Sequence, residues 1–251
     1  MVTIDLNADL GELPGPGGEA IDADLMAVVT SANIATGGHA GDAASMDRVC
    51  RLAARHGVSV GAHLSFEDRV GFGRRVPDRI DADLAASLRA QLHALIHACD
   101  RVGIAVSYVK PHGALYHLAL RRRDVAAVLV DSVADSGLAV LSMHPSQLQV
   151  VAAAAGLDTY AEFFADRGYL PTGGLVPRGM DGDLVHIGLA DRVLQAVTTG
   201  SVTAANGEVI GVQVDSVCVH GDSPDAVAHA RGIRQGLEQG GVRVRAFTGT
   251  T

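Results

Sequence analysis

Two patterns of apolar residues alternate along this chain. Short β-branched runs, typical of buried strands, are separated by longer stretches in which apolar residues recur every three or four positions, as in amphipathic helices. Strands that alternate with helices in this way pair in parallel, so the pattern predicts an α/β fold. The runs predicted as strands are 3–8, 32–36, 58–62, 104–109, 138–143, 159–164 and 214–219, with 242–247 as a candidate eighth strand.

Capping residues delimit several of the predicted helices. Asp42 or Ser45 is suited to begin a helix whose apolar residues share one face. Ser146 is suited to cap a later helix, and Ser223 followed by Pro224 to begin the last one. Two long segments are predicted to be loops: 64–79, which contains Gly and several Arg residues, and 168–183, which is rich in Gly and Pro. The remaining helices are expected to begin near residues 22, 81, 124 and 190.

Polar residues fall at the carboxyl end of nearly every predicted strand. In a βα barrel these ends meet at one face, where active sites lie, whereas a doubly wound open sheet would spread them along a line. We therefore expect a single (βα) barrel domain over residues 1–251, with the open sheet as the alternative. The strand-end residues are Asn7, Asp9, Asn33, His39, His63, Lys110, His112, His144, Glu162, Asp166, His220 and Asp222.

Composition excludes several classes of partner. The net charge of −8, the absence of Trp and an aromatic content of 4% argue against nucleic acid. The three cysteines are widely spaced and form no CxxC pair, which is typical of reduced thiols in the cytoplasm. We find neither a secretory signal nor an apolar run of the roughly 20 residues that a membrane helix needs. A cytoplasmic protein with no membrane partner is expected.

One lysine stands out, because the other 19 of the 20 basic residues are arginine. Lys110 lies where an apolar run ends at Pro111, two residues before His112. A compact ammonium holds an anion as a point charge and can lose its proton when desolvated, which a guanidinium does poorly. Lys110 and His112 are therefore predicted to be functional.

Some histidines have the spacing of metal ligands. His93 and His97 are four residues apart but fall on the polar face of their helix, so we expect a surface pair. His39 and His63 each follow a strand, and with Asp9 they form either a site for a divalent metal that activates water or a metal-free acid/base set. The sequence does not decide between the two, and we lean toward the metal-free set.

The sequence contains no clear nucleotide-binding motif. The segment 15–20 loosely matches a dinucleotide fingerprint, but Pro16 removes a needed N–H and Glu19 repels phosphate. No P-loop pattern occurs in the sequence. Arginines in the two long loops are candidates to bind a carboxylate or phosphate, Arg167 and Arg178 above all because they lie in apolar, Gly- and Pro-rich sequence.

Several blocks together resemble the LamB/YcsF family, with which the chain agrees in order from residue 3 to about 245. The blocks are DLNADLGE at 5–12, SANIA at 31–35, HAGD at 39–42, GAH at 61–63, VKPHGALY at 109–116, FADRGY at 164–169, LVPR at 175–178 and HGD at 220–222. Three positions depart from the family pattern: Thr36 replaces a Cys, Gly38 an aromatic residue and Leu64 a Pro. The first departure argues against a nucleophilic thiol there.

The resemblance implies a seven-stranded barrel related to sugar deacetylases. It also implies ATP-dependent hydrolysis of the lactam 5-oxoproline to L-glutamate by a 5-oxoprolinase, in which this chain would be the A component and would act with subunits B and C. ATP would be bound at a non-standard site or mostly by a partner subunit. Two other classes stay open, a stand-alone metal-dependent deacetylase or amidohydrolase and a non-catalytic scaffold subunit.

Roles for individual residues follow from lactam chemistry together with the resemblance. Asp9 with His39 or His63 would activate water. Lys110 and His112 would stabilise the charge on oxygen or protonate the ring nitrogen, and Arg167 or Arg178 would hold the substrate carboxylate. The residues expected to bind substrate are Asn7, Glu12, Asn33, Asp42, Glu162, Asp166, Arg167, Arg178, His220 and Asp222.

Overall fold

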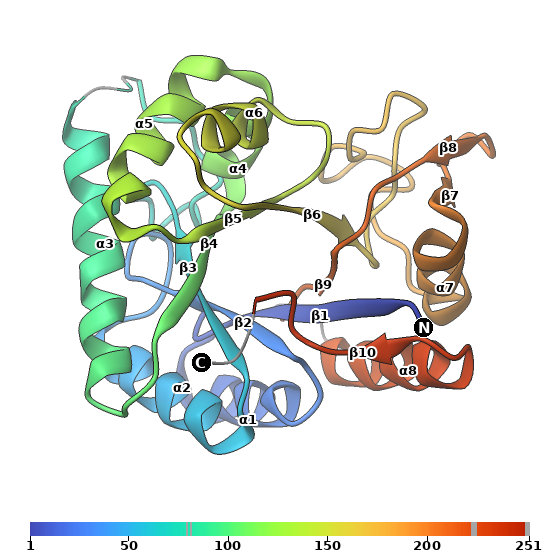
Figure 1. Cartoon of the computed structure of the whole chain (residues 1–251), viewed down its shortest axis with the longest axis horizontal. Coiled ribbons are helices and arrows are strands. Elements are labelled where there is room, and N and C mark those ends of the chain that lie inside the picture. The colour runs from blue at the N-terminus through green and yellow to red at the C-terminus, as the bar shows by residue number, and fades with distance from the viewer. Residues whose placement is uncertain (79, 81, 222–224, 249–251) are drawn as a thin grey trace.

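Seven parallel strands close into a barrel in this computed structural model, which describes residues 1–78, 80, 82–221 and 225–248. The last barrel strand pairs with both β6 and β1, which closes the ring and rules out the open sheet. Figure 1 shows the strands at the centre with helices around them. In order around the ring the strands are β1 (Thr3–Leu10), β2 (Ser31–Ala35), β3 (Ser59–Leu64), β4 (Val106–Pro111), β5 (Ala139–Ser142), β6 (Thr159–Phe164) and β9 (Ser216–Val219).

Helices cover the outside of the barrel. They are α1 (Gly15–Met26), α2 (Ala43–His56), α3 (Ala82–Asp100), α4 (Gly113–Arg121), α5 (Arg123–Val133), α6 (Gln147–Ala154), α7 (Leu189–Thr199) and α8 (Ala226–Gln239), with a 3₁₀ turn at Ala134–Ser136. Among the described residues, no helix combines the length and the apolar character needed to cross a bilayer.

The N-terminus of α2 follows the predicted capping pattern. The Asp42 carboxylate accepts a hydrogen bond from the Ser45 N–H at 2.8 Å, and the Asp42 N–H donates to the Ser45 hydroxyl at 2.8 Å. Two backbone donors at the helix end are thereby satisfied. The apolar face of α2 packs against the core through Met46, Val49, Cys50 and Ala53.

Four features differ from the sequence prediction. Helix α1 begins at Gly15 rather than near residue 22, because Pro16 is tolerated in a first helical turn. Helix α4 directly follows β4, in a segment for which no element was predicted. The short strands β7 (Ser201–Thr203) and β8 (Val209–Gly211) form an antiparallel hairpin beside α7 and outside the barrel (Figure 1). The expected terminal strand is reduced to β10 (Arg243–Val244), which pairs with the start of β1. The start of the last helix, at Ser223 and Pro224, lies outside the described residues.

Polar side chains fill much of the barrel interior. Asp5, Asn7 and Asp9 alternate along β1 and point inward, where all three are buried. At the lowest level the Asp5 carboxylate accepts hydrogen bonds from the hydroxyls of Thr30, Ser31 and Ser216. Above it, Asn33 donates to the side-chain oxygens of Asn7 and Asp9. The network leads upward to the carboxyl ends of the strands, where the candidate site lies.

Candidate functional site

A cavity of about 390 Å³ opens at the carboxyl ends of β1, β3, β4, β6 and β9. Seven of the residues predicted from the sequence line it: Asp9, His63, Lys110, His112, Arg167, Arg178 and His220. They are up to 211 positions apart in the chain (residues 9 to 220) and are brought together by the closure of the barrel.

Lys110 is held at the inner wall of this cavity by two carboxylates. Its Nζ lies 2.8 Å from Oδ1 of Asp9 and 2.8 Å from Oε1 of Glu162, and the residue is only 1% exposed. Burial alone would lower the pKa of Lys110, but the charges of Asp9 and Glu162 outweigh it and raise the pKa well above its usual value. Lys110 therefore remains an ammonium ion and does not act as a neutral amine.

Asp9 stays ionised in the same surroundings. Burial favours its neutral form, yet His63 and Lys110 lower the pKa of Asp9 well below the usual range. Its Oδ1 also accepts a hydrogen bond from Asn33 at 2.8 Å, and its Oδ2 lies 3.3 Å from Nε2 of His63. Asp9 is thus a fixed, ionised carboxylate, suited to orient a water molecule.

Four buried side chains converge beside Asp9. One potential ligand atom from each of Glu12, His39, His63 and His112 lies within 4.8 Å of all the others. Burial is the main cause that lowers the pKa of His39 to about 2 and the pKa of His112 well below 6.5, and the neighbouring His63 lowers both further. His112 is therefore neutral at physiological pH, which argues against its expected role as a proton donor. The sequence had grouped His39 and His63 with Asp9, but the structure adds Glu12 and His112 to them.

His220 pairs with an acidic residue at the wall of the cavity. Its Nδ1 lies 2.9 Å from Oδ1 of Asp166, and its ring stacks on Phe164 with centroids 5.2 Å apart. Burial alone would lower the pKa of His220, but the Asp166 carboxylate raises it above the usual value. A protonated imidazole that lines the cavity is a better acid than His112.

Three residues that were predicted to bind substrate contact other parts of the protein instead of the cavity. Asn7 and Asn33 are fully buried in the interior network below the cavity. Asp42 caps α2 and does not line the cavity. Their positions do not support direct contact with a substrate, because Asn7 and Asn33 point inward at depth and Asp42 caps the following helix.

The two loop arginines have different surroundings. The Arg167 guanidinium is turned into its own loop, where it donates to the carbonyl oxygens of Val176 at 2.7 Å and Asp183 at 3.0 Å. Arg178 is exposed and lines the cavity, so it is the better placed of the two to bind an anion. Asp222 lies outside the described residues.

Sequence reasoning assigned no role to several residues of the site. The Tyr116 hydroxyl donates to Oε2 of Glu162 at 2.9 Å, and Sγ of Cys218 lies 3.2 Å from Nζ of Lys110. His117, whose pKa burial lowers to about 4, and Arg121 also line the cavity, as does Arg74, one of the loop arginines predicted to bind an anion. Tyr116 and His117 lie on α4, and a helix predicted directly after Lys110 would have placed them there.

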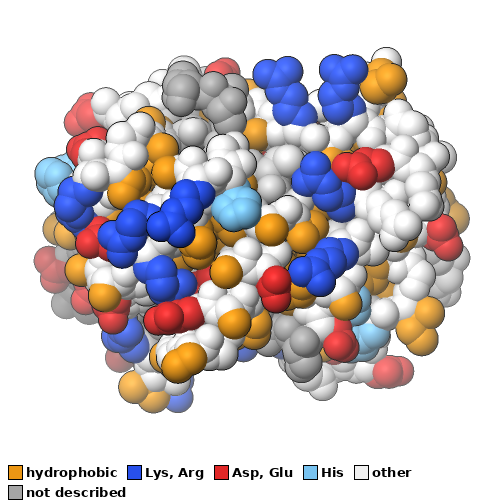
Figure 2. All heavy atoms as spheres, turned by 90° about the horizontal axis from the view of Figure 1, so that it is seen from below, with side chains coloured by type: hydrophobic (Ala, Val, Ile, Leu, Met, Phe, Trp, Pro, Cys, Tyr) orange, Lys and Arg blue, Asp and Glu red, His pale blue; other side chains and the backbone are white. Residues whose placement is uncertain are grey.

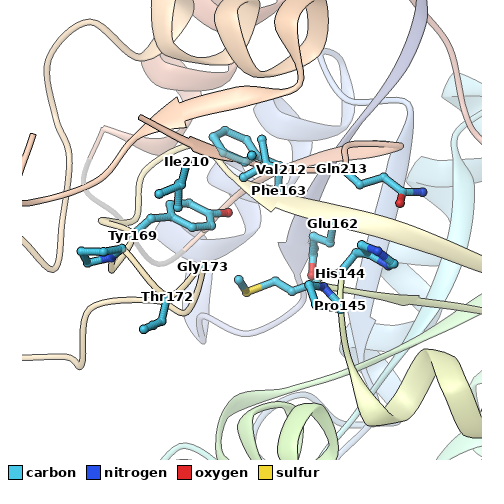
Figure 3. Close-up of a pocket in the computed structure, with 13 residues that line it drawn as sticks. His144, Pro145, Glu162, Phe163, Tyr169, Thr172, Gly173, Ile210, Val212 and Gln213 are labelled. Carbon is cyan, nitrogen blue, oxygen red and sulfur yellow. The ribbon is translucent and has the colours of Figure 1, made fainter. Parts of the chain in front are cut away.

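A second cavity, of about 310 Å³, lies near β5 and the β7–β8 hairpin (Figure 3). Its ionisable lining residues are His144, Glu162 and Tyr169. His144 is hydrogen-bonded to Oε1 of Gln149 at 2.9 Å. The first cavity carries the greater concentration of charged and acid/base groups. Elsewhere, basic side chains are interspersed with acidic and hydrophobic ones on the face shown in Figure 2.

Comparison with known proteins gives consistent results. The model of the LamB/YcsF family matches residues 4–251. The chain is 46% identical to the A subunit of 5-oxoprolinase from Mycobacterium leprae (strain Br4923), over 98% of this chain and 100% of that protein. It is 49% identical to the protein of the same name from Streptomyces avermitilis, over 97% and 99% of the two chains. The crystal structure of a lactam utilization protein from Thermus thermophilus superposes with a TM-score of 0.90 at 38% identity, covering 98% of this chain and 100% of that one.

Proposed function

This chain belongs to the LamB/YcsF family, and from that premise we propose that it is the A subunit of a 5-oxoprolinase, which hydrolyses 5-oxo-L-proline to L-glutamate at the expense of ATP. The names of the relatives support the reaction, and the lactam utilization protein supports the substrate class. The observation that carries the proposal is the Asp9–Lys110–Glu162 ion cluster, because it places a fixed carboxylate and a permanent cation at the wall of one cavity.

The chemistry demanded by a lactam fits these groups. A five-membered lactam is a stable amide with a poor leaving group, and phosphorylation of its oxygen by ATP makes the ring carbon an electrophile. Asp9, close to His63, activates the water that attacks this carbon. The C–N bond then breaks, and the ring nitrogen takes a proton from the His220 imidazolium. A second water molecule hydrolyses the resulting γ-glutamyl phosphate, which releases L-glutamate and inorganic phosphate. Lys110 stabilises negative charge that develops on oxygen.

The negative charge of the substrate carboxylate is bound at the mouth of the cavity. Arg74, Arg121 and Arg178 line it together with the residues above. A guanidinium binds a carboxylate or a phosphate through paired hydrogen bonds. We assign binding of the lactam carboxylate to Arg178. Arg167 orders its own loop.

ATP binding and partners form a separate part of the proposal. The sequence contains no P-loop. We therefore assign most of the nucleotide contacts to a non-standard site or to partner subunits. We take these partners to be subunits B and C, because the relatives are named as the A component of their enzyme.

The proposal is tested by mixing the purified chain with 5-oxoproline and ATP, with and without the two partner subunits, and measuring glutamate. In the full mixture, Lys110→Arg is expected to lower glutamate formation by at least about 100-fold, because a bulkier planar cation does not fit between Asp9 and Glu162. Arg101→Lys is the matched control, since Arg101 pairs with Asp47 at the surface. Normal turnover by Lys110→Arg would refute the role of the lysine.

A metal-dependent amidohydrolase is the competing function, and the cluster of Glu12, His39, His63 and His112 supports it. It predicts amide hydrolysis by the chain alone, without ATP, and loss of that activity on chelation. Glutamate release that requires both ATP and the partner subunits would exclude this function.

A further inference from the structure

The three histidines beside Glu12 are oriented by protein oxygens on their outer side. Nδ1 of His63 lies 3.1 Å from the carbonyl oxygen of Lys110, and Nε2 of His112 lies 2.9 Å from that of Phe72. A carbonyl oxygen only accepts hydrogen bonds, so both of these ring nitrogens carry hydrogen. In the neutral rings, the inner nitrogens, Nε2 of His63 and Nδ1 of His112, then present lone pairs.

These two lone pairs face each other. The inner nitrogens of His63 and His112 are 3.0 Å apart, and Oε1 of Glu12 lies 3.7 Å and 3.5 Å from them. Atoms that carry only lone pairs repel one another at such distances unless a cation lies between them. The arrangement thus calls for a positive charge at its centre.

His39 completes the group in the same manner. Its Nδ1 lies 2.9 Å from the Ser65 hydroxyl, which itself donates to the carbonyl oxygen of Phe66. The hydroxyl oxygen therefore accepts from His39, and Nε2 of His39 points its lone pair at Oε1 of Glu12, 2.9 Å away. An outer hydrogen bond that fixes the tautomer is the usual arrangement for metal-binding histidines.

We propose that Glu12, His39, His63 and His112 bind one zinc ion in a four-coordinate site. Tetrahedral zinc with bonds of about 2.0–2.1 Å separates its ligand atoms by about 3.3–3.4 Å. Four of the six ligand-atom pairs, at 2.9, 3.0, 3.5 and 3.7 Å, scatter around that value, and all six lie within 4.8 Å. Three imidazoles and one carboxylate favour zinc over magnesium, which prefers oxygen ligands in an octahedron. This proposal does not depend on the proposed function.

The surrounding loop encloses the site. The Phe72 ring packs edge-on against His39 and His112, with centroids 5.3 and 5.2 Å away. Phe72 has a φ of 55°, a conformation that a non-glycine residue rarely adopts, and it presents its carbonyl oxygen to His112. At Gly73 a Cβ atom would lie 2.8 Å from His39 and 2.9 Å from His112. The close fit is typical of a built site.

The ion would join four consecutive βα units. Glu12 follows β1, His39 follows β2, His63 lies near the end of β3 and His112 follows β4. Metal binding would therefore hold the carboxyl ends of these strands together and stabilise the folded chain. It would also form part of the cavity wall, because His63 and His112 line the cavity.

The test uses the full chain and zinc itself. Protein from zinc-supplemented growth should contain about one zinc per chain by elemental analysis, and zinc or cobalt added after chelation should raise the midpoint of thermal unfolding. Glu12→Gln keeps the shape of the side chain but removes its charge, so zinc affinity should fall at least about tenfold. His93→Ala/His97→Ala is the matched control, because these two histidines are exposed on α3 and should not affect binding.

Several outcomes would overturn the site. They are failure of the wild-type chain to take up zinc, a response to magnesium alone, equal zinc affinity in Glu12→Gln, and loss of zinc in the His93/His97 variant. Should Glu12→Gln not fold, X-ray absorption on the zinc-loaded wild type decides the matter. Three imidazole ligands and one oxygen are expected, and any spectrum without the three imidazoles contradicts the proposal.

Discussion

Replacing Lys110 with methionine removes the only positive charge from a buried cluster. Wild type has one ammonium between Asp9 and Glu162, whose side chains are 5% and 0% exposed. The variant keeps the length of the side chain but leaves two carboxylates facing each other without a cation. Loss of one partner from a buried ion pair typically costs about 3–5 kcal/mol, and we expect Lys110→Met to lower the free energy of unfolding by this amount.

A second substitution should restore much of that loss. With Glu162→Gln added, one carboxylate remains, so the cluster returns to the single net negative charge that it has in wild type. The double variant should therefore be more stable than Lys110→Met, by about 1–3 kcal/mol. The deficit of Lys110→Met should also shrink as pH falls, because an unpaired carboxylate takes up a proton more readily.

Urea unfolding followed by circular dichroism measures these differences. Arg101→Met is the matched control, because Arg101 pairs with Asp47 but has a side chain that is 52% exposed, and we expect at most about 1 kcal/mol there. A loss below about 1 kcal/mol in Lys110→Met, or a double variant no more stable than the single one, would refute the argument that the lysine neutralises the cluster.

Three further predictions concern the barrel and its helices. Burial raises the pKa of Asp5 from 3.8 to about 6. The stability that protonated Asp5 contributes is thus complete below pH 3.8 and is lost as pH rises through about 6. Over that range the free energy of unfolding of Asp5→Asn should rise relative to that of wild type by up to about 3 kcal/mol. A difference in stability between the two proteins that does not change with pH would contradict this. Asp42→Ala should destabilise the chain by about 0.5–2 kcal/mol in thermal unfolding, because the Ser45 N–H loses its acceptor, whereas Asp42→Ser should retain most of the stability. Gly61→Ala should destabilise by at least about 1–3 kcal/mol, because a Cβ atom there would lie 2.2 Å from the ring of Tyr108, while Gly232→Ala in α8, where nothing lies within 4 Å, should stabilise by about 0.5–1 kcal/mol. Equal effects of these two glycine substitutions would contradict the packing argument.

The sequence by itself determined the features that depend on local periodicity and capping. Strand 159–164 was predicted with its observed bounds, and the cap of α2 is Asp42, one of the two candidates that the sequence offered. Both predictions succeeded because alternation, apolar stripes and caps depend on residues only a few positions apart. The same local reasoning failed at α1 and α4, where Gly and Pro at helix starts resemble loop composition. The parallel barrel followed from the alternation of elements and from the polar strand ends.

Only the tertiary structure decided which of these polar residues meet. Glu12 contacts three histidines from three other βα units, and Lys110 pairs with Glu162 from a strand 52 positions further along the chain. Asn7 and Asn33 were expected at the same face but lie deeper in the barrel, and Arg167 is turned into its own loop. The reason is geometric. A sequence shows that a side chain lies near a strand end, but its direction and its partners depend on strand phase, on barrel closure and on burial across the whole ring.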